Sequence, residues 1–200
     1  MKHIKIAITG GIGSGKSTVL SILKDKGYPT FSCDDIYKEI IEKEDYILKI
    51  EELFPTAVKN GKIDRKELSA LVFNNNENLD LLNSVAHPMI MQALLTRMEQ
   101  SAQMVVFAEV PLLFEINAEK YFDVIWVVTR EKKDRITAVQ YRDGVNKSEV
   151  ENRIAAQIDY EKEEGKTKLN QPNVYILDNN VSLEELDKKI NELLTNLMQS

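Results

Sequence analysis

Apolar residues follow two periods along this chain, and the change between them predicts its secondary structure. Five short segments are mostly apolar, and we expect strands at residues 4–8, 28–32, 104–108, 122–129 and 173–178. The third and fourth are nearly continuous apolar runs, as in strands that are buried on both faces. Between the segments, apolar residues recur at helical spacing. This order predicts an α/β fold in which five parallel strands are joined by crossover helices.

Residues 44–102 have a different character, with helical spacing and no convincing strand. Asp64 to Glu67 resembles the start of a capped helix, and Pro88 suits the first turn of another helix. We therefore expect a helical insert over 44–102, on a core made of residues 1–43, 103–141 and 167–200. The insert is longer than a simple crossover, so we expect it to shape a second binding site.

The C-terminal third predicts three more helices. A charged helix is expected over residues 130–142, inside the core, and residues 142–166 then form a lid. In the lid, Ser148 is expected to cap a helix with Val150, Ile154 and Ile158 on one stripe. A closing helix follows Ser182. Its expected buried stripe consists of Leu183, Leu186, Ile190 and Leu194.

Length and composition restrict the class of protein. A chain of 200 residues fits one domain with small inserts, and its apolar runs are too short to span a membrane. The start of the chain does not resemble a signal peptide, and the single cysteine, Cys33, suits a reducing compartment. We expect a cytoplasmic protein, either a monomer or a weak homo-oligomer. The net charge of −6 argues against general nucleic-acid binding.

The stretch Gly10–Thr18 fits the phosphate-binding pattern G-x-x-x-x-G-K-[ST], between an expected strand and an expected helix. Glycines let the backbone fold around a polyphosphate, and the N–H groups at the helix start point toward it. We expect the nucleotide to contact Gly11, Ile12, Gly13, Ser14, Gly15, Lys16, Ser17 and Thr18. Lys16 would reach the outer phosphates, and Ser17 would bind magnesium. The alternative is a chance glycine-rich turn.

Two kinds of nucleotide-using protein remain open. One is a kinase that transfers the γ-phosphoryl group to a small acceptor, and the other is a nucleotide-dependent switch protein. Asn146 to Glu149 nearly fits the N-K-x-D pattern of GTP switches, but it ends in Glu and follows a polar turn. No D-x-x-G pattern occurs in the chain. The kinase interpretation is therefore favoured.

Two acidic positions support kinase chemistry. Asp34 follows the second expected strand, at the sheet edge where ligands of such folds bind, and a carboxylate there can deprotonate an attacking hydroxyl. It can equally cap a helix, and for Asp35 a cap or a solvated position is the better interpretation. Glu109 ends the third strand and is a candidate magnesium ligand, with a surface turn as the alternative.

A basic segment in this acidic chain predicts a lid that closes over phosphates. Its cations are Arg130, Lys132, Lys133, Arg135, Arg142 and Lys147. Arg142, in a turn, is the preferred functional residue, because arginine matches phosphate geometry, whereas Lys132 and Lys133 are expected to be solvated. Arg153 would either join the lid or pair with Glu149. His87 alone is more typical of a structural residue than of a substrate contact.

Several further motifs occur in an order typical of one family. They are Thr9–Thr18, the Asp34 segment, His87-Pro88, Pro111-Leu112-Leu113-Phe114-Glu115, Arg142-Asp143, Arg153-Ile154-Ala155-Ala156-Gln157 and Leu177-Asp178-Asn179. On these motifs the whole chain resembles the dephospho-CoA kinases. The resemblance implies a nucleotide-kinase-like P-loop fold with a helical CoA-binding insert and a mobile lid. It also implies ATP-dependent phosphorylation of the ribose 3′-hydroxyl of dephospho-CoA.

The resemblance also implies roles for single residues. Asp34 would be the base, Lys16 and Ser17 the phosphate and magnesium contacts, Arg142 a lid arginine, and His87 part of the acceptor side. Asn179 would lie near the adenine of ATP. The chain departs from the usual pattern at Ser32, Met91, Glu109 and Val181, where the family often has Asp, Arg, Asp and Gly. Asp34 is therefore expected to act without a second carboxylate.

Overall fold

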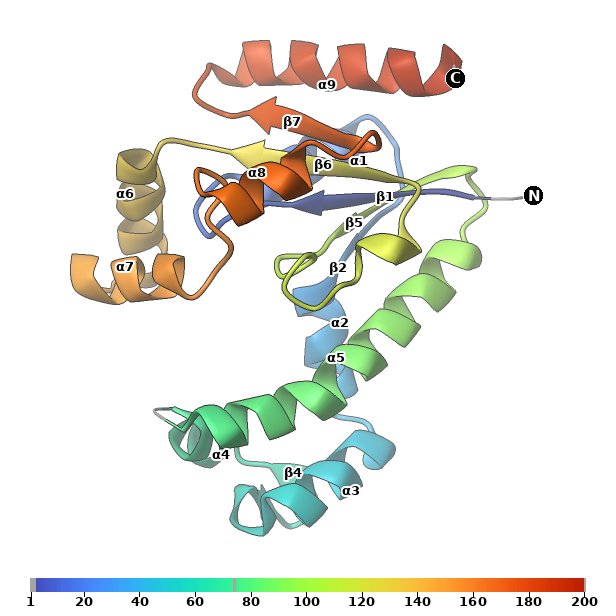
Figure 1. Cartoon of the computed structure of the whole chain (residues 1–200). Coiled ribbons are helices and arrows are strands. Elements are labelled where there is room, and N and C mark those ends of the chain that lie inside the picture. Colours follow the sequence, from blue (N-terminus) through green and yellow to red (C-terminus); the bar gives the residue numbers. More distant parts are fainter. Residues whose placement is uncertain (1–2, 74, 200) are drawn as a thin grey trace. The chain divides into compact units, whose positions relative to one another are not determined.

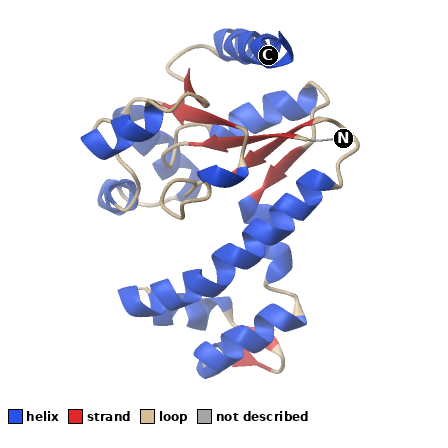
Figure 2. Ribbon diagram, turned by 45° about the vertical axis from the view of Figure 1, so that its right-hand side comes forward, coloured by secondary structure: helices blue, strands red, loops and turns tan. Residues whose placement is uncertain are grey.

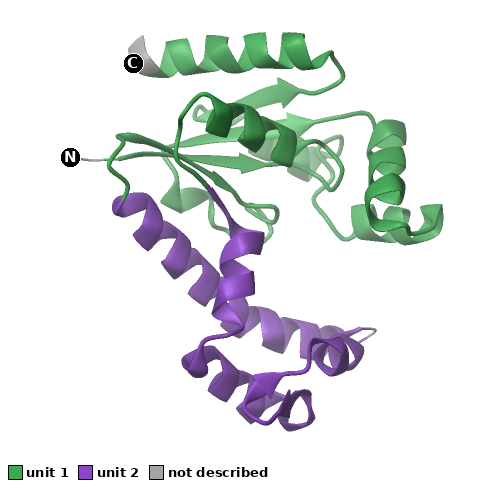
Figure 3. Ribbon diagram, turned by 180° about the vertical axis from the view of Figure 1, so that it is seen from behind, with its two compact units in different colours: residues 1–30, 101–200 green, residues 31–100 purple. Residues whose placement is uncertain are grey.

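The computed structural model describes residues 3–73 and 75–199. The chain divides into two compact units, which are described separately here: residues 1–30 with 101–200, and residues 31–100 (Figure 3). The expected limits of core, insert and lid remain predictions. None of the helices in the described residues is both long enough and apolar enough to cross a membrane.

A five-stranded parallel sheet organises the first unit (Figure 1), and this prediction is confirmed. Its strands are β1 (Ile4–Thr9), β2 (Thr30–Ser32), β5 (Val105–Glu109), β6 (Val124–Thr129) and β7 (Val174–Asp178). Their order is β2-β5-β1-β6-β7, and the chain passes into the second unit within β2. In the centre, Ile8 of β1 lies opposite Glu109 of β5 and Trp126 of β6. The chain that leaves β1 therefore starts from the middle of the sheet.

Two helices bury their apolar stripes against the sheet. They are α1 (Lys16–Asp25) and α9 (Leu183–Gln199), and Figure 2 shows helices on both sides of the strands. Together with the strands they form a hydrophobic core cluster of buried residues: Ile6, Ile8, Val19, Leu23, Phe107, Trp126, Val128, Leu177, Leu186, Ile190 and Leu194. Leu183 was wrongly expected in this stripe. It is 68% exposed, because the first turn of α9 stands outside the apolar cluster.

Helix ends follow the expected chemistry in most places. Gly27 follows α1 with φ of +85°, and its N–H donates to the carbonyl of Lys24. Ser182 caps α9, since Ser182 and Glu185 exchange backbone-to-side-chain hydrogen bonds. Local residues therefore provide hydrogen bonds at the C-terminal end of α1 and at the N-terminal end of α9.

Besides α9, the C-terminal third contains three helices, of which the last was not predicted, and one predicted cap is corrected. They are α6 (Lys132–Asp143), α7 (Lys147–Ala155) and α8 (Glu163–Leu169), and the short 3-10 helix η2 (Glu119–Tyr121) lies earlier in the chain. Asn146, not Ser148, caps α7 and forms a capping box with Glu149. The helix α7 ends at Ala155, so Ile158 lies beyond it and is not part of the predicted stripe. Ile136, Val139 and Val150 make a small apolar cluster between α6 and α7.

The second unit is helical, but it contains a small hairpin that the sequence interpretation missed. Its helices are α2 (Cys33–Ile40), α3 (Glu44–Leu53), η1 (Pro55–Ala57), α4 (Arg65–Val72) and α5 (Asn76–Glu99). The strands β3 (Val58–Lys59) and β4 (Lys62–Ile63) pair in antiparallel fashion. Asn60 and Gly61 turn the chain with φ of 53° and 69°, which is the usual signal for such a hairpin.

Two other predictions for this unit had different outcomes. Asp64 does cap α4, accepting hydrogen bonds from the N–H groups of Lys66 and Glu67. Pro88, however, does not begin a helix, because it lies inside the 24-residue α5. Proline lacks the N–H for one bond of the helix ladder, and Figure 1 shows α5 bending along its length. Packing along α5, whose Ala86, Met91, Leu94 and Met98 are buried, offsets this loss.

Candidate active site

The loop between β1 and α1 has the geometry of an anion-binding site. Gly15 caps α1 with φ of +98°, and Gly13 has φ of +77°, both in the left-handed region that favours glycine. The carbonyl of Gly15 accepts the N–H groups of Thr18 and Val19, and α1 begins at Lys16. The first N–H groups of a helix have no partners within the helix, so they are available to a phosphate group.

A buried cation lies inside this loop. The Lys16 side chain donates from Nζ to the carbonyl oxygens of Gly10 at 2.9 Å and Gly11 at 3.2 Å, and the residue is only 8% exposed. The hydroxyl of Ser14 is also buried and has no hydrogen-bond partner among the described residues. Ser17 is exposed. The loop thus combines a positive charge with a buried donor.

Side chains from three later segments hold the backbone of the loop. Gln157 Oε1 accepts the N–H of Ile12 at 2.7 Å, and Arg135 Nε donates to the carbonyl of Ile12 at 2.9 Å. Asn179 Nδ2 donates to the carbonyl of Ser14 at 2.8 Å. The side chain of Ile12 packs on the apolar cluster between α6 and α7. Ile12 is therefore fixed to the α6–α7 region and to Gln157 through its N–H, its carbonyl and its side chain.

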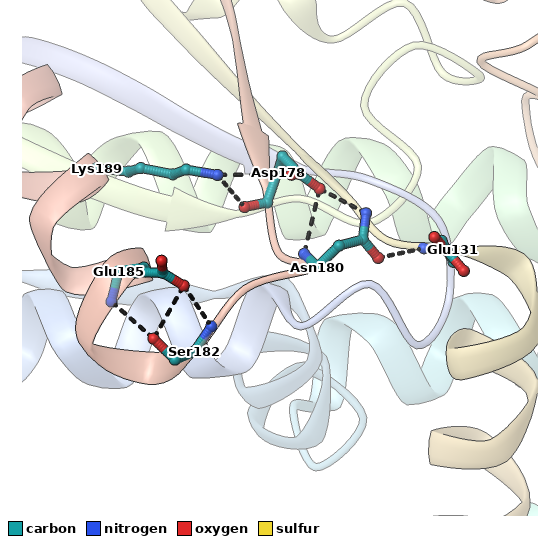
Figure 4. A network of polar contacts seen from close by, with 6 residues as sticks. All are labelled: Glu131, Asp178, Asn180, Ser182, Glu185 and Lys189. Carbon is teal, nitrogen blue, oxygen red and sulfur yellow. Dashed lines mark hydrogen bonds and ion pairs between the residues drawn. The ribbon is translucent and has the colours of Figure 1, made fainter.

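The segment after β7 is itself held by a polar network (Figure 4). The side chain of Asn180 accepts the N–H of Glu131 at 2.8 Å and donates to Asp178 Oδ1 at 2.5 Å. Lys189 Nζ lies 3.5 Å from Asp178 Oδ2 and donates to the Asp178 carbonyl. The backbone N–H of Asn179 bonds the carbonyl of Thr129. These contacts fix Asn179 between the end of β6 and the phosphate loop.

A pocket of about 270 Å³ opens beside the loop within the first unit. Its lining residues are Gly11, Ser14, Val128, Thr129, Arg130, Glu131, Arg135, Asp159, Tyr160, Glu161, Leu169 and Asn180. Arg130 Nε is buried without a hydrogen-bond partner among the described residues. The pocket therefore offers two arginines next to the loop that carries Lys16.

The predicted lid cations form a shared ion pair. Arg142 and Arg153 both contact Asp143, at 2.7 Å and 2.8 Å. The Arg142 guanidinium, followed by that of Arg153, holds the pKa of the Asp143 carboxyl below its ordinary value. Arg153 therefore has Asp143 as its partner, while Glu149 serves the cap of α7. The predicted turn position of Arg142 is wrong, because α6 continues to Asp143 and includes it, while Arg153 lies in α7. Asp143 brings the two arginines together.

Glu109 ends β5, as the sequence predicts, and is partly buried. It lies beside Ile8, two residues before the phosphate loop. No group of three or more His, Cys, Asp and Glu side chains suited to a metal occurs among the described residues. A magnesium ion here would therefore take most of its ligands from water and a bound nucleotide.

The remaining predicted site residues lie in the second unit. Asp34 is exposed in the first turn of α2, and its neighbour Asp35 is exposed and paired with Lys38 at 2.7 Å. His87 is half-buried within α5, and burial lowers the pKa of its imidazole below the ordinary value. Met91 is buried. Asp34 thus keeps its carboxylate free of the Lys38 ion pair that Asp35 makes.

A hollow of about 340 Å³ lies in the same unit, between the α2–α3 segment and α5. It is lined by Ile40, Lys43, Asp45, Met89, Gln92, Ala93, Thr96, Arg97 and Gln100. Arg97 is held there by Glu39. The helical unit therefore carries a polar hollow of its own.

Comparison with known proteins identifies the family. A model of the dephospho-CoA kinase family matches residues 4–185. The chain belongs to this family. The dephospho-CoA kinases of Fusobacterium nucleatum and Thermus thermophilus are each 36% identical to it, over 95% and 98% of this chain and 96% and 93% of theirs.

Solved structures agree with this assignment. The protein TT1252 from Thermus thermophilus matches with a TM-score of 0.82 and 34% identity, covering 98% of this chain and 99% of that one. The dephospho-CoA kinase from Campylobacter jejuni has a TM-score of 0.64 and 26% identity, covering 97% of each chain. A gluconokinase and a shikimate kinase, both 16% identical, share the fold. The predicted P-loop kinase fold is thereby confirmed.

Sequence reasoning did not find two residues that hold the loop. Arg135 was counted only within the basic segment, and Gln157 only as the last letter of the Arg-Ile-Ala-Ala-Gln run. The family-typical run was a usable signal for Gln157. Arg135 carried no local signal, because only the folded chain brings it to Ile12.

Proposed function

We propose that the protein is a dephospho-CoA kinase, which transfers the γ-phosphoryl group of ATP to the ribose 3′-hydroxyl of dephospho-CoA. The products are CoA and ADP, and the reaction is the last step of CoA synthesis. The observation that carries the proposal is the phosphate loop, with Lys16 buried at its centre, in a chain that matches this family over residues 4–185. We place the reaction in the cytoplasm, which suits the lone Cys33.

The loop suits the triphosphate of ATP. Glycines leave room for the side chains that hold the loop: a Cβ on Gly15 would lie 2.1 Å from Asn179 Nδ2. The Lys16 ammonium and the N–H groups at the start of α1 can then bind phosphate oxygens. Ser17 and Glu109 are our candidates to hold magnesium together with the nucleotide. Magnesium supplies charge that offsets the developing negative charge on the phosphates.

Asp34 is our candidate for the general base. It would accept the proton of the ribose hydroxyl as the oxygen attacks the γ-phosphorus. His87 and the hollow in the second unit are candidates for the acceptor side. Arg142 and Arg153 would close over the phosphates from the lid, where guanidinium groups bind them in a forked geometry. Positioning and charge then contribute most of the rate, as in other phosphoryl transfers.

One assay tests the reaction. ADP release from Mg-ATP is measured with dephospho-CoA, with nucleoside monophosphates, with gluconate or shikimate, and with no acceptor. We expect stimulation by dephospho-CoA alone. Stimulation by another acceptor would make the protein a different kinase of this fold, and slow release that no acceptor changes would indicate a switch protein.

A further inference from the structure

Arg135, one of the cations of the basic segment, lies directly against the phosphate loop. Its Nε donates to the carbonyl of Ile12 at 2.9 Å. A Cβ built on Gly11 would lie 2.2 Å from its Nη2. The guanidinium therefore occupies the space that only a glycine at position 11 leaves open.

Among residues 3–73 and 75–199, no carboxylate forms an ion pair with this guanidinium. Arg135 is partly buried, it makes no ion pair within the described residues, and Nη1 and Nη2 have no hydrogen bond there. Burial lowers its pKa, although Asp159 and Glu161, which line the same pocket, act in the opposite direction. An unpaired, partly buried cation is costly, and an anion bound beside it would offset that cost.

Arg142 has a different environment. Its side chain is exposed, and both Nε and Nη2 donate to the carboxylate of Asp143. Two of its donors are therefore already used in an ion pair with water around it, where such pairs contribute little. Arg135, by contrast, keeps its two Nη groups beside the pocket that Gly11 and Ser14 line.

We propose that Arg135 binds the polyphosphate of the nucleotide donor through its Nη groups, while its Nε holds the loop in place through Ile12. This rests on the proposed function only in requiring a nucleoside triphosphate as the donor. Arg135 thus fixes the conformation of the loop and also supplies positive charge to the phosphates. A fork with three donor nitrogens can do both, and a lysine cannot.

The test is nucleotide binding without acceptor, by calorimetry, with Mg-ATP and with AMP. Arg135→Gln keeps a donor for Ile12 but removes the charge. We expect its Kd for ATP to rise about 10- to 100-fold, because a charge-assisted bond is lost, and its Kd for AMP to change less than about threefold. Arg135→Lys should lie between, and Lys133→Met, an exposed charge on the same helix, should resemble the wild type.

The opposite results are equally clear. An unchanged Kd for ATP, or an equal loss for ATP and AMP, would show that Arg135 only supports the fold. Should the variants not fold, wild-type protein decides: ATP must protect Arg135 from phenylglyoxal, and AMP must not. Because no acceptor is present, a failure with dephospho-CoA would sink the proposed reaction and leave this result standing.

Discussion

The backbone N–H of Ile12 donates to the side-chain oxygen of Gln157 at 2.7 Å, joining the phosphate loop to a residue 145 positions later. Gln157 lies just after α7, and Ile12 packs on the cluster that α6 and α7 form. The loop and the segment predicted as a lid are thus fastened at one residue. If that segment moves, the hydrogen bond between Ile12 and Gln157 must break or the phosphate loop must move with it.

Gln157→Leu tests whether the contact shapes the nucleotide site. Leucine keeps the size but removes the acceptor, so the Ile12 N–H loses its partner. We expect KM for ATP to rise about 3- to 10-fold, the scale of one lost hydrogen bond, with kcat nearly unchanged. Gln157→Glu retains an acceptor oxygen and should lie closer to the wild type. Equal kinetics for the leucine variant would mean that the bond does not matter in the working enzyme.

Asp34→Asn tests the proposed base. We expect kcat to fall about 100- to 10,000-fold, the usual share of a general base, with the Kd for ATP nearly intact. Asp35→Asn is a matched control, since Asp35 is the next residue on the same turn and pairs with Lys38. Normal turnover in Asp34→Asn, or an equal loss in both variants, would remove Asp34 from that role.

Gly11→Ala should weaken nucleotide binding indirectly, by displacing the Arg135 side chain. The new methyl group would meet the end of the Arg135 side chain, which is flexible enough to move away. We therefore expect the melting temperature to stay within about 3 °C of the wild type, while ATP binding weakens about 10-fold as Arg135 is displaced. Adding the change to an Arg135→Gln background should cause little further loss. Full additivity of the two changes would show that they act separately.

The stability of the protein should depend on pH through His87. Burial lowers the pKa of its imidazole below the ordinary value of 6.5, so the unfolded chain takes up the proton more readily. The free energy of unfolding should then decrease as the pH falls below about 6.5 and stay level above it. His87→Gln should flatten this part of the curve in denaturant titrations at pH 5 to 7.5. NMR titration of the same variant identifies the His87 signal, since the chain has two histidines.

Much of the first unit could be predicted from local patterns. The strands β5 and β6 are buried along most of their length, so the apolar runs at 104–108 and 122–129 mark them to within two residues. The phosphate loop has a recognisable sequence motif because its positive φ angles favour glycine. Leu183 was misplaced, since a helical stripe does not show where the core ends.

Other features depended on weaker or longer-range information. The hairpin at Asn60-Gly61 had a local signal that the surrounding helical spacing obscured. Pro88 was taken as a helix start, because the packing that keeps α5 continuous is not visible in sequence. The contacts of Ile12 with Arg135 and Gln157 join residues more than 120 positions apart, so no local pattern reveals them.

The fastening of the phosphate loop has a consequence for biosynthesis. The loop lies near the start of the chain, but its backbone is held by Arg135, Gln157 and Asn179. A ribosome releases those residues long after residue 18. The loop of the nascent chain lacks these hydrogen bonds until the later residues have been synthesised. We therefore expect nucleotide binding to be acquired only after residues 135, 157 and 179 have been synthesised, and fragments that end before them to bind nucleotide less tightly.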